Sequence, residues 1–318
     1  MMSSAAPDRT GPSRWMPAAM LRRFLGALAL LLAGATAAAP ALRIAYVDWS
    51  SSVASANVVC AVIEERLDQR CELIQTTARE MWRLVADGEA DAMLSAWLPD
   101  THAEYLAAFE DRVQDLGPNL VGTRTGLVIP ATGVGRQTGA FGERSAPSLD
   151  IRSIPELAEH RRELDGRIVG IDPEAGIMQA TEQAIDVYKL GGFRLVQGDE
   201  SMMTAALAAA LARNRPIVVT GWIPHWMFGR WSLRFLEDPE EVYGGTGRIH
   251  TMARTGLADE QPSATMVLDR FEWTPQEMEQ LLVWIYQDRG RDPYSQALRW
   301  IRAHQDRVDA WVEVRAQP

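Results

Sequence analysis

The sequence predicts an α/β protein made of two lobes with a ligand cleft between them. Short β-like runs alternate with helical segments along the chain, which is typical of sheets built from βαβ units. This alternation starts again near Ile151, after a stretch from 131 to 150 that is rich in Gly, Ser, Thr and Pro and is typical of a surface loop. A motif of strand, Trp, aliphatic residue and Pro also occurs twice, once in each half.

The first half is predicted to contain three strands, two helices and a crossing strand. Apolar residues at helical spacing, and a Gly that ends the second helix, separate these elements from one another. We expect strands at Leu42–Val47, Cys71–Thr76 and Asp91–Ala96, helices at Val53–Leu67 and Ala78–Asp87, and the crossing strand at Gly126–Ile129.

The second half repeats this order and is followed by a last strand and a group of helices. We expect helices at Ile154–His160, Ile177–Tyr188 and Met202–Arg213, strands at Arg167–Ile171, Phe193–Gln197, Pro216–Thr220 and His250–Arg254, and closing helices at Pro262–Phe271, Thr274–Asp288 and Pro293–Val312. The chain then passes between the lobes twice. Lobe I is predicted to comprise residues 40–125 and 246–318, and lobe II residues 126–245.

The first 39 residues have the pattern of a secretory signal peptide. Arg14, Arg22 and Arg23 precede the apolar run Phe24–Gly34, and the small residues Ala35–Ala39 follow it. The alternative is a membrane anchor, but the apolar run is much shorter than the ~20 residues that a spanning helix needs. We therefore expect residues 1–39 to be removed and the remaining chain to be periplasmic.

Composition excludes several classes of function. The formal net charge of −10 disfavours nucleic acid and anionic membranes as partners. No His or Cys spacing is typical of a zinc site, and no Ser, Cys and His pattern is typical of a nucleophilic enzyme, so we expect no metal, no cofactor and no catalysis. Cys60 and Cys71 either form a disulfide or remain as two buried thiols.

Two tryptophans stand at the carboxyl ends of predicted strands. Trp97 follows the run DAMLSA and precedes Leu98-Pro99, and Trp222 follows PIVVT and precedes Ile223-Pro224. Ligands bind at the carboxyl ends of parallel strands, and aromatic faces hold a trimethylammonium group that no hydrogen bond can hold. The alternative is core packing, which we expect for the tryptophans within amphipathic helices, namely Trp284, Trp300 and Trp311.

A carboxylate site is suggested where the first strand meets the first helix. Asp48 and Trp49 are followed there by Ser50, Ser51 and Ser52, and serines at a helix start leave backbone amides pointing outward. The alternative is ordinary helix capping without a ligand. A comparable turn, at residues 170–177, opens a helix of lobe II and lacks the spacing of a phosphate-binding glycine loop.

The chain resembles the glycine betaine/proline-type substrate-binding proteins of ABC importers, the OpuAC family. The resemblance rests on eight segments in family order: YVDWSSSVASANVV (46–59), DGEADAMLSAWLPDTH (87–102), DLGPNLVGTRTGLVIP (115–130), GIDPEAGIM (170–178), VVTGWIPHWMF (218–228), FLEDPEEVYG (235–244), IHTMARTGL (249–257) and LDRFEWTPQEM (268–278). It implies a type II periplasmic-binding-protein fold that closes around its ligand.

The resemblance also implies a site and partners. Three tryptophans would form an aromatic prism, namely Trp97, Trp222 and Trp273, although Trp273 also occupies the position of a hydrophobic staple. Amides of Ser51, Ser52 and Val53 would bind the ligand's carboxylate. The implied function is delivery of glycine betaine or a related betaine, by a monomer, to the membrane permease of an ABC importer.

Two alternatives remain from the sequence. Related choline binders place a Trp near the first strand and an acidic group near the alcohol, and Trp49, Asp48 and Asp100 leave that ligand open. His225, in the run WIPHW, either lines the site or packs beneath it. A periplasmic sensor that binds the same solutes would share all of these features.

Overall fold

The computed structural model describes residues 40–131 and 149–313. The predicted signal peptide and residues 132–148 of the predicted loop lie outside this part. Its strands follow one continuous order, β2-β1-β3-β9-β4-β7-β5-β6, with β8 paired to β4. None of the helices within the described ranges is long and apolar enough to span a bilayer.

The sheet of lobe I is mixed, with three parallel strands followed by antiparallel ones, and helices cover it. Strands β1 (Leu42–Val47), β2 (Cys71–Thr76) and β3 (Ala92–Leu98) run parallel, and β9 (Gly247–Arg254) joins β3 in the antiparallel sense. Helices α2 (Ser50–Leu67) and α3 (Ala78–Ala86) pack against these strands. Because both faces are covered, β3 is buried along its whole length and is apolar except for Ser95.

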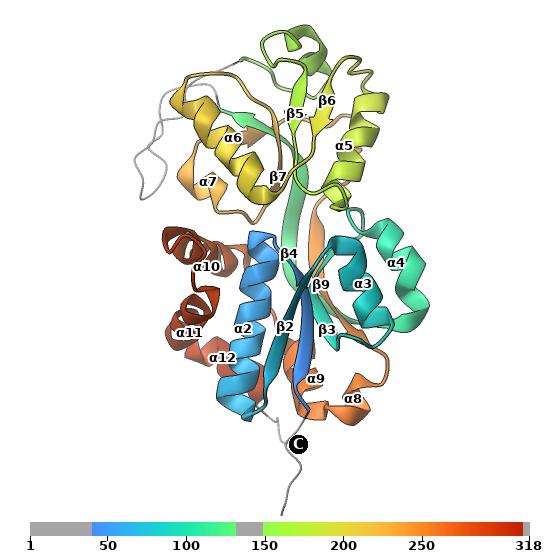
Figure 1. The fold of residues 1–318 in the computed structure, drawn as a ribbon, viewed down its shortest axis with the longest axis vertical. Coiled ribbons are helices and arrows are strands. Elements are labelled where there is room, and N and C mark those ends of the chain that lie inside the picture. The colour runs from blue at the N-terminus through green and yellow to red at the C-terminus, as the bar shows by residue number, and fades with distance from the viewer. Residues whose placement is uncertain (1–39, 132–148, 314–318) are drawn as a thin grey trace, which may run out of the picture. The chain divides into compact units, whose positions relative to one another are not determined.

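One long strand joins the two lobes. β4 (Val113–Pro130) pairs with β9 up to Thr123 and with β7 from Arg124 onward, and Figure 1 shows it passing between the lobes. The sequence predicts only Gly126–Ile129, because the first part of the strand is largely exposed and carries polar residues that hide the pattern. We propose that lobe I comprises residues 40–125 and 246–318 and that lobe II comprises residues 126–245. The change of partner along β4 supports these boundaries.

Lobe II has shorter strands and repeats the α/β order. β5 (Arg167–Val169) runs parallel to β6 (Arg194–Val196) and to β7 (Val219–Ile223), while β8 (Leu233–Phe235) pairs with β4. Its helices are α5 (Gly176–Val187), α6 (Glu200–Ala212) and α7 (Met227–Arg230), and the predicted helix at 154–160 is the 3₁₀ helix η3 (Pro155–His160). β7 begins and ends three residues later than predicted, and because of its later end it includes Trp222.

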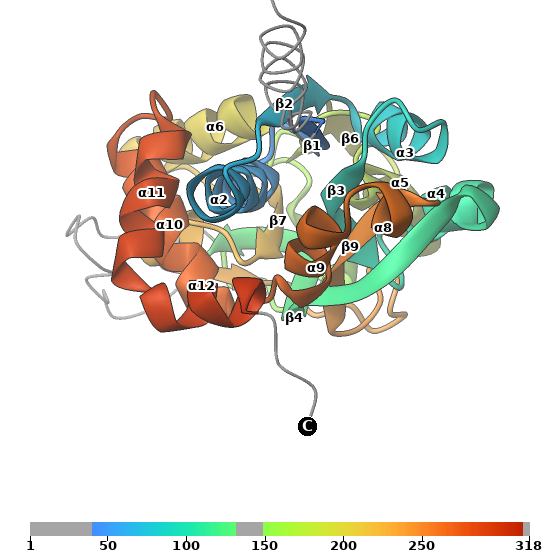
Figure 2. The same cartoon turned by 90° about the horizontal axis from the view of Figure 1, so that it is seen from below.

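The last helices cover lobe I. α8 (Leu257–Glu260) and α9 (Pro262–Arg270) are followed by α10 (Pro275–Gln287), α11 (Pro293–Ala303) and α12 (Gln305–Val312). α10 and α11 pack against α2, as Figure 2 shows. The prediction of one helix over 293–312 was wrong, because His304 has φ −129° and ψ 42° and interrupts the helix. α4 (Ala103–Phe109) and η1 (Glu110–Arg112) lead from β3 to β4.

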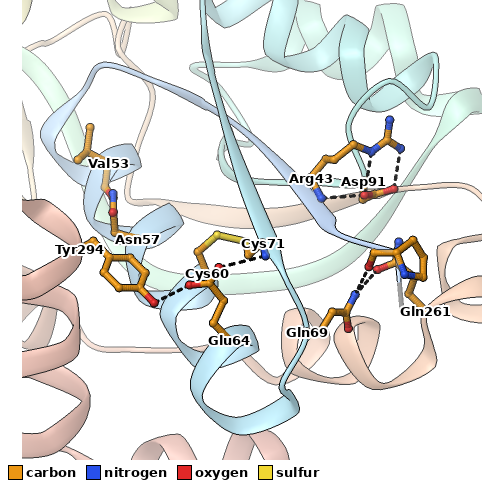
Figure 3. Close-up of a disulfide and its surroundings, with 11 residues drawn as sticks. Arg43, Val53, Asn57, Cys60, Glu64, Gln69, Cys71, Asp91, Gln261 and Tyr294 are labelled. Carbon is orange, nitrogen blue, oxygen red and sulfur yellow. Dashed lines mark hydrogen bonds and ion pairs between the residues drawn. A yellow bond between two sulfur atoms is a disulfide. The ribbon is translucent and has the colours of Figure 1, made fainter. Parts of the chain in front are cut away.

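A disulfide joins the middle of α2 to the start of β2. Cys60 and Cys71 are bonded, with their Cα atoms 5.4 Å apart (Figure 3). Beside it, the Cys71 amide donates to Glu64 Oε1 at 3.3 Å, and the hydroxyl of Tyr294 in α11 donates to Glu64 Oε2 at 2.5 Å. The choice left open by the sequence is thus settled in favour of the disulfide.

Candidate functional site

A cavity lies where the two lobes meet. About 320 Å³ between its walls is not filled by protein atoms, solvent at its mouth included. Lobe I contributes Trp49, Ser51, Trp97, Thr101, His102 and Thr125, and lobe II contributes Ile171, Ala175, Gly176, Ile177 and Trp222. Because both lobes supply walls, the cavity is complete only when they are together.

Three indoles form the aromatic part of the cavity. Trp97 is the penultimate residue of β3, Trp222 lies in β7, and Trp49 is the N-cap residue of α2. Each is almost fully buried, with 4 to 6 % of its surface exposed. In both copies of the motif, the peptide bond before the Pro is cis. Both repeated motifs place an indole on the same cavity.

Trp49 completes this group through a contact with lobe II. Its indole N–H donates to Asp172 Oδ2 at 2.8 Å, and its ring centroid lies 5.9 Å from that of His102. Burial raises the pKa of Asp172, although the hydrogen bond from Trp49 opposes this. In the sequence Trp49 is a site residue only in the choline alternative, whereas the structure places it beside Trp97 and Trp222.

His102 is a lining residue with an unpaired hydrogen-bond donor. Its Nδ1 accepts from the backbone N–H of Trp97 at 3.2 Å and from the indole N–H of Trp82 at 3.4 Å. Burial lowers the pKa of His102 to about 3, so the ring is neutral and the two donors at Nδ1 assign its proton to Nε2. Nε2 is buried and finds no hydrogen-bond partner among the described residues.

The N-terminus of α5 also lines the cavity. Gly176 and Ile177 are its first two residues, and both line the cavity. The N-cap residue, Ala175, makes no side-chain hydrogen bond to the helix start. Amides in the first turn of a helix lack intrahelical partners, and the helix dipole favours an anion there. A Cβ on Gly176 would lie 1.8 Å from the carbonyl oxygen of Thr101, so a glycine is required where the lobes meet.

At the start of α2, where the sequence predicted a site for the ligand's carboxylate, a carboxylate of the protein is bound instead. The Ser50 amide donates to Glu200 Oε2 of lobe II at 2.8 Å, so the protein's own carboxylate lies at this helix terminus. Ser51 lines the cavity, and its hydroxyl has no partner among the described residues. Ser52 does not line it, because its hydroxyl accepts from the Val47 amide at 3.2 Å within lobe I.

Two further predicted residues lie away from the cavity. Trp273 packs in the core of the C-terminal helices, with ring centroids 5.3 Å from Phe271 and 5.6 Å from Trp300, and is absent from the described lining. Phe271, which follows α9, and Trp300 of α11 hold it there. His225 is fully buried behind Trp222, with the two ring centroids 4.6 Å apart, so it packs beneath the wall.

Sequence reasoning did not select His102, Gly176 or Asp172. His102 stands five residues after Trp97 within a quoted segment, and Gly176 opens a helix without a capping side chain. The sequence Ala175-Gly176 offers no capping side chain, which was a signal for free amides at this helix start. Within the described ranges, no group of three or more His, Cys, Asp or Glu side chains could hold a metal ion.

Comparison with known proteins assigns the chain to one family. Residues 40–303 match the model of OpuAC, the substrate binding domain of ABC-type glycine betaine transport system. A glycine betaine/carnitine transport binding protein, GbuC, from Listeria monocytogenes serotype 1/2a (strain 10403S) is 44% identical over 148 residues. Those residues are 46% of this chain and 49% of GbuC, so the chain spans about half the length of this curated relative.

Solved structures resemble the chain over most of its length. Lactococcal OpuAC, closed and complexed with glycine betaine, is 35% identical with a TM-score of 0.77, covering 86% of this chain and all of the other. ProX from Borrelia burgdorferi, a glycine betaine/L-proline-binding protein, is 30% identical with a TM-score of 0.78, covering 86% and 97%. An ABC-transporter choline binding protein in complex with choline is 25% identical with a TM-score of 0.75, covering 85% and 91%.

Proposed function

The chain belongs to the OpuAC family of substrate-binding domains of ABC-type glycine betaine transport systems, and from this we propose that it binds glycine betaine or a closely related betaine for an ABC importer. The observation that carries the proposal is one cavity that offers both indole faces and N–H donors. We assign the indoles of Trp49, Trp97 and Trp222 to an aromatic end, and His102 Nε2–H with the first amides of α5 to a polar end. A betaine has a methylated cation for the one and a carboxylate for the other.

The aromatic end suits the cation. Each indole face in contact with a desolvated quaternary ammonium contributes about 0.5–2 kcal/mol, so three contribute about 2–6 kcal/mol. Micromolar binding requires about 8 kcal/mol, so the cation alone does not account for such affinity. The carboxylate must supply the rest.

The polar end suits that carboxylate. We propose that His102 Nε2–H and the amides of Gly176 and Ile177 donate to it, in place of the predicted amides of Ser51 and Ser52. Hydrogen bonds to a charged group are each worth about 1.5–3 kcal/mol, which is enough to supply the remainder. The α5 dipole adds to this attraction.

The cavity favours a betaine over choline. None of the described lining residues is Asp or Glu, and Asp48 and Asp100, the acids of the choline alternative, are not among them. Choline would therefore place a hydroxyl against several N–H donors, and its single oxygen would leave some of them buried without a partner. Similarity to a choline binding protein keeps choline as the second candidate.

We also propose the cellular setting that the sequence suggests. Residues 1–39 direct the chain to the periplasm and are then removed, and a monomer of the remaining chain delivers its ligand to a membrane permease. The protein acts without a cofactor or a catalytic step. A periplasmic sensor of the same solutes is the alternative, and uptake of labelled betaine by proteoliposomes that hold the partner permease and ATPase tests between them.

Calorimetry on the protein from residue 40 onward tests the ligand. Glycine betaine and proline betaine should bind at micromolar concentration or tighter, and choline at least tenfold more weakly, because it lacks the carboxylate. Ectoine serves as a compatible solute without a quaternary ammonium. If neither betaine releases heat nor changes the tryptophan emission, the proposed ligand class is incorrect.

A further inference from the structure

Glu200 is a buried carboxylate at the first position of α6. Only 8 % of its surface is exposed. It is not the cap of its own helix, because the Asp199 side chain accepts from the Met202 amide at 2.6 Å and performs that role. The contacts that hold the Glu200 carboxylate lie outside α6.

Those contacts come from both lobes. Oε2 accepts from the Ser50 amide of lobe I at 2.8 Å. Oε1 lies 3.1 Å from His225 Nε2 and accepts from the Trp226 indole N–H at 3.3 Å, both in lobe II. Burial alone would raise the pKa of Glu200, but His225 and the Ser50 amide outweigh it and hold the pKa below its ordinary value. The group is therefore an anion at the N-terminus of α2.

The same network reaches two walls of the cavity. His225 Nδ1 accepts from the Met227 amide at 3.0 Å, and Nε2, on the other side of the ring, lies beside Glu200. The His225 ring packs edge-on against Trp222. Ser50 directly follows Trp49, so a single carboxylate is linked to one indole of each lobe.

We propose that Glu200 is a positioning residue that holds the cleft closed and sets the orientation of the ligand. It caps α2 only while the lobes are together, since opening separates it from Ser50 and leaves the helix terminus without this anion. By occupying that terminus it also excludes the ligand's carboxylate from α2, so that the carboxylate is directed to α5 and His102. This inference rests on the proposed function.

The contact between Glu200 and Ser50 then stabilises the closed state independently of the ligand. A ligand that binds only the closed state gains apparent affinity in proportion to the population of that state. Removing the Glu200 charge lowers that population without removing any atom of the cavity lining. Dissociation should accelerate more than association slows, because the contact forms after the lobes meet.

The test compares Glu200→Gln with Glu182→Gln, an exposed glutamate of α5 in the same lobe. Glycine betaine binding is measured by calorimetry, dissociation by stopped-flow tryptophan fluorescence, and the radius of gyration by X-ray scattering with and without betaine. We expect Glu200→Gln to weaken binding about tenfold, as loss of a charged hydrogen bond implies, with a matching rise in the dissociation rate. Glu182→Gln should leave both unchanged.

Glu200→Ala extends the test, and Glu200→Gln decides it if the Ala variant does not fold. Affinity and dissociation rate within twofold of the parent protein in every folded Glu200 variant would overturn the proposal. If the parent protein binds no betaine, the proposed function fails, and the ligand-free radius of gyration then tests Glu200 alone. A larger radius in Glu200→Gln supports its role in closure, and an equal radius overturns it.

Discussion

Trp49 and Asp172 meet across the cleft, with the indole N–H of Trp49 donating to Asp172 Oδ2 at 2.8 Å. The two residues are 123 positions apart and belong to different lobes. The contact fixes the plane of an indole that forms a wall of the ligand cavity. Closing the lobes therefore also orients an aromatic face towards the space that a quaternary ammonium would fill.

Removing the Asp172 carboxylate should weaken ligand binding. We expect Asp172→Ala to raise the Kd for glycine betaine about tenfold, because it removes a charged hydrogen bond and frees the Trp49 ring. Asp172→Asn keeps an acceptor oxygen and should lose less. Calorimetry measures both, and Asp186→Ala, an exposed residue of α5, is the control. Unchanged affinity in Asp172→Ala would contradict this role.

Three cavity tryptophans should each be required for binding. Trp49→Ala, Trp97→Ala and Trp222→Ala should each weaken glycine betaine binding at least tenfold, since each removes an aromatic face from the cation. Fluorescence titration of the remaining tryptophans and calorimetry check this. A variant of the three that binds as tightly as the parent protein would remove its indole from the site.

Trp273 should behave as a core residue. Trp273→Ala should lower the free energy of unfolding by about 3–5 kcal/mol, as for other large-to-small core changes, and the folded fraction should bind betaine with little change in Kd. Urea unfolding measures the first effect. Trp273→Phe, which leaves a smaller void, keeps the binding test available if the Ala variant is too unstable. A loss of affinity in stable Trp273→Phe would place this indole in the site.

A methyl group at Gly176 should prevent closure without unfolding either lobe. Its Cβ would lie 1.8 Å from the Thr101 carbonyl oxygen, which belongs to the other lobe. We expect Gly176→Ala to weaken betaine binding about a hundredfold or more, while thermal unfolding of the ligand-free protein changes little. Gly191→Ala is the matched control, since its Cβ would meet no described atom within 4 Å. Equal affinity in the two variants would show that the lobes need not approach this closely.

His102 should make the ligand-free protein less stable in acid. Its folded pKa of about 3 lies below the ordinary value of 6.5, so between these values the unfolded chain binds the extra proton. The contribution of neutral His102 is thus complete above about pH 6.5 and falls by about 1.4 kcal/mol per pH unit below it. Urea unfolding between pH 7 and 5 measures the slope, which should be smaller in His102→Gln. The same slope in both proteins would contradict the burial of a neutral ring.

Reducing the disulfide should destabilise lobe I and leave the site intact. Cys60 and Cys71 are 11 residues apart, and a crosslink over a loop of that size contributes about 3 kcal/mol. We expect Cys60→Ala with Cys71→Ala to lower the free energy of unfolding by that order, with unchanged betaine affinity, because neither residue lines the cavity. A large loss of affinity in the folded double variant would show that the disulfide supports the site.

Local pattern was enough to predict most of the fold and part of the site. β1 and β2 have the predicted bounds, because a short run of strand-forming residues between turn residues is typical of a strand. Trp97 and Trp222 were predicted to line a cleft from their immediate neighbours, since a strand and a following Pro fix where an indole stands. These features depend on interactions between residues close together in the chain, which a single sequence displays.

Only the tertiary structure decided between positions that look alike locally. Trp49 is the N-cap residue of α2 and Trp273 directly precedes that of α10, yet packing places the first on the cavity and the second among Phe271 and Trp300. The N-termini of α2 and α5 are likewise similar as anion sites, and Glu200, 150 residues from Ser50, occupies the first. Contacts between distant residues settle such choices, because they depend on how the lobes meet, and no local pattern records that.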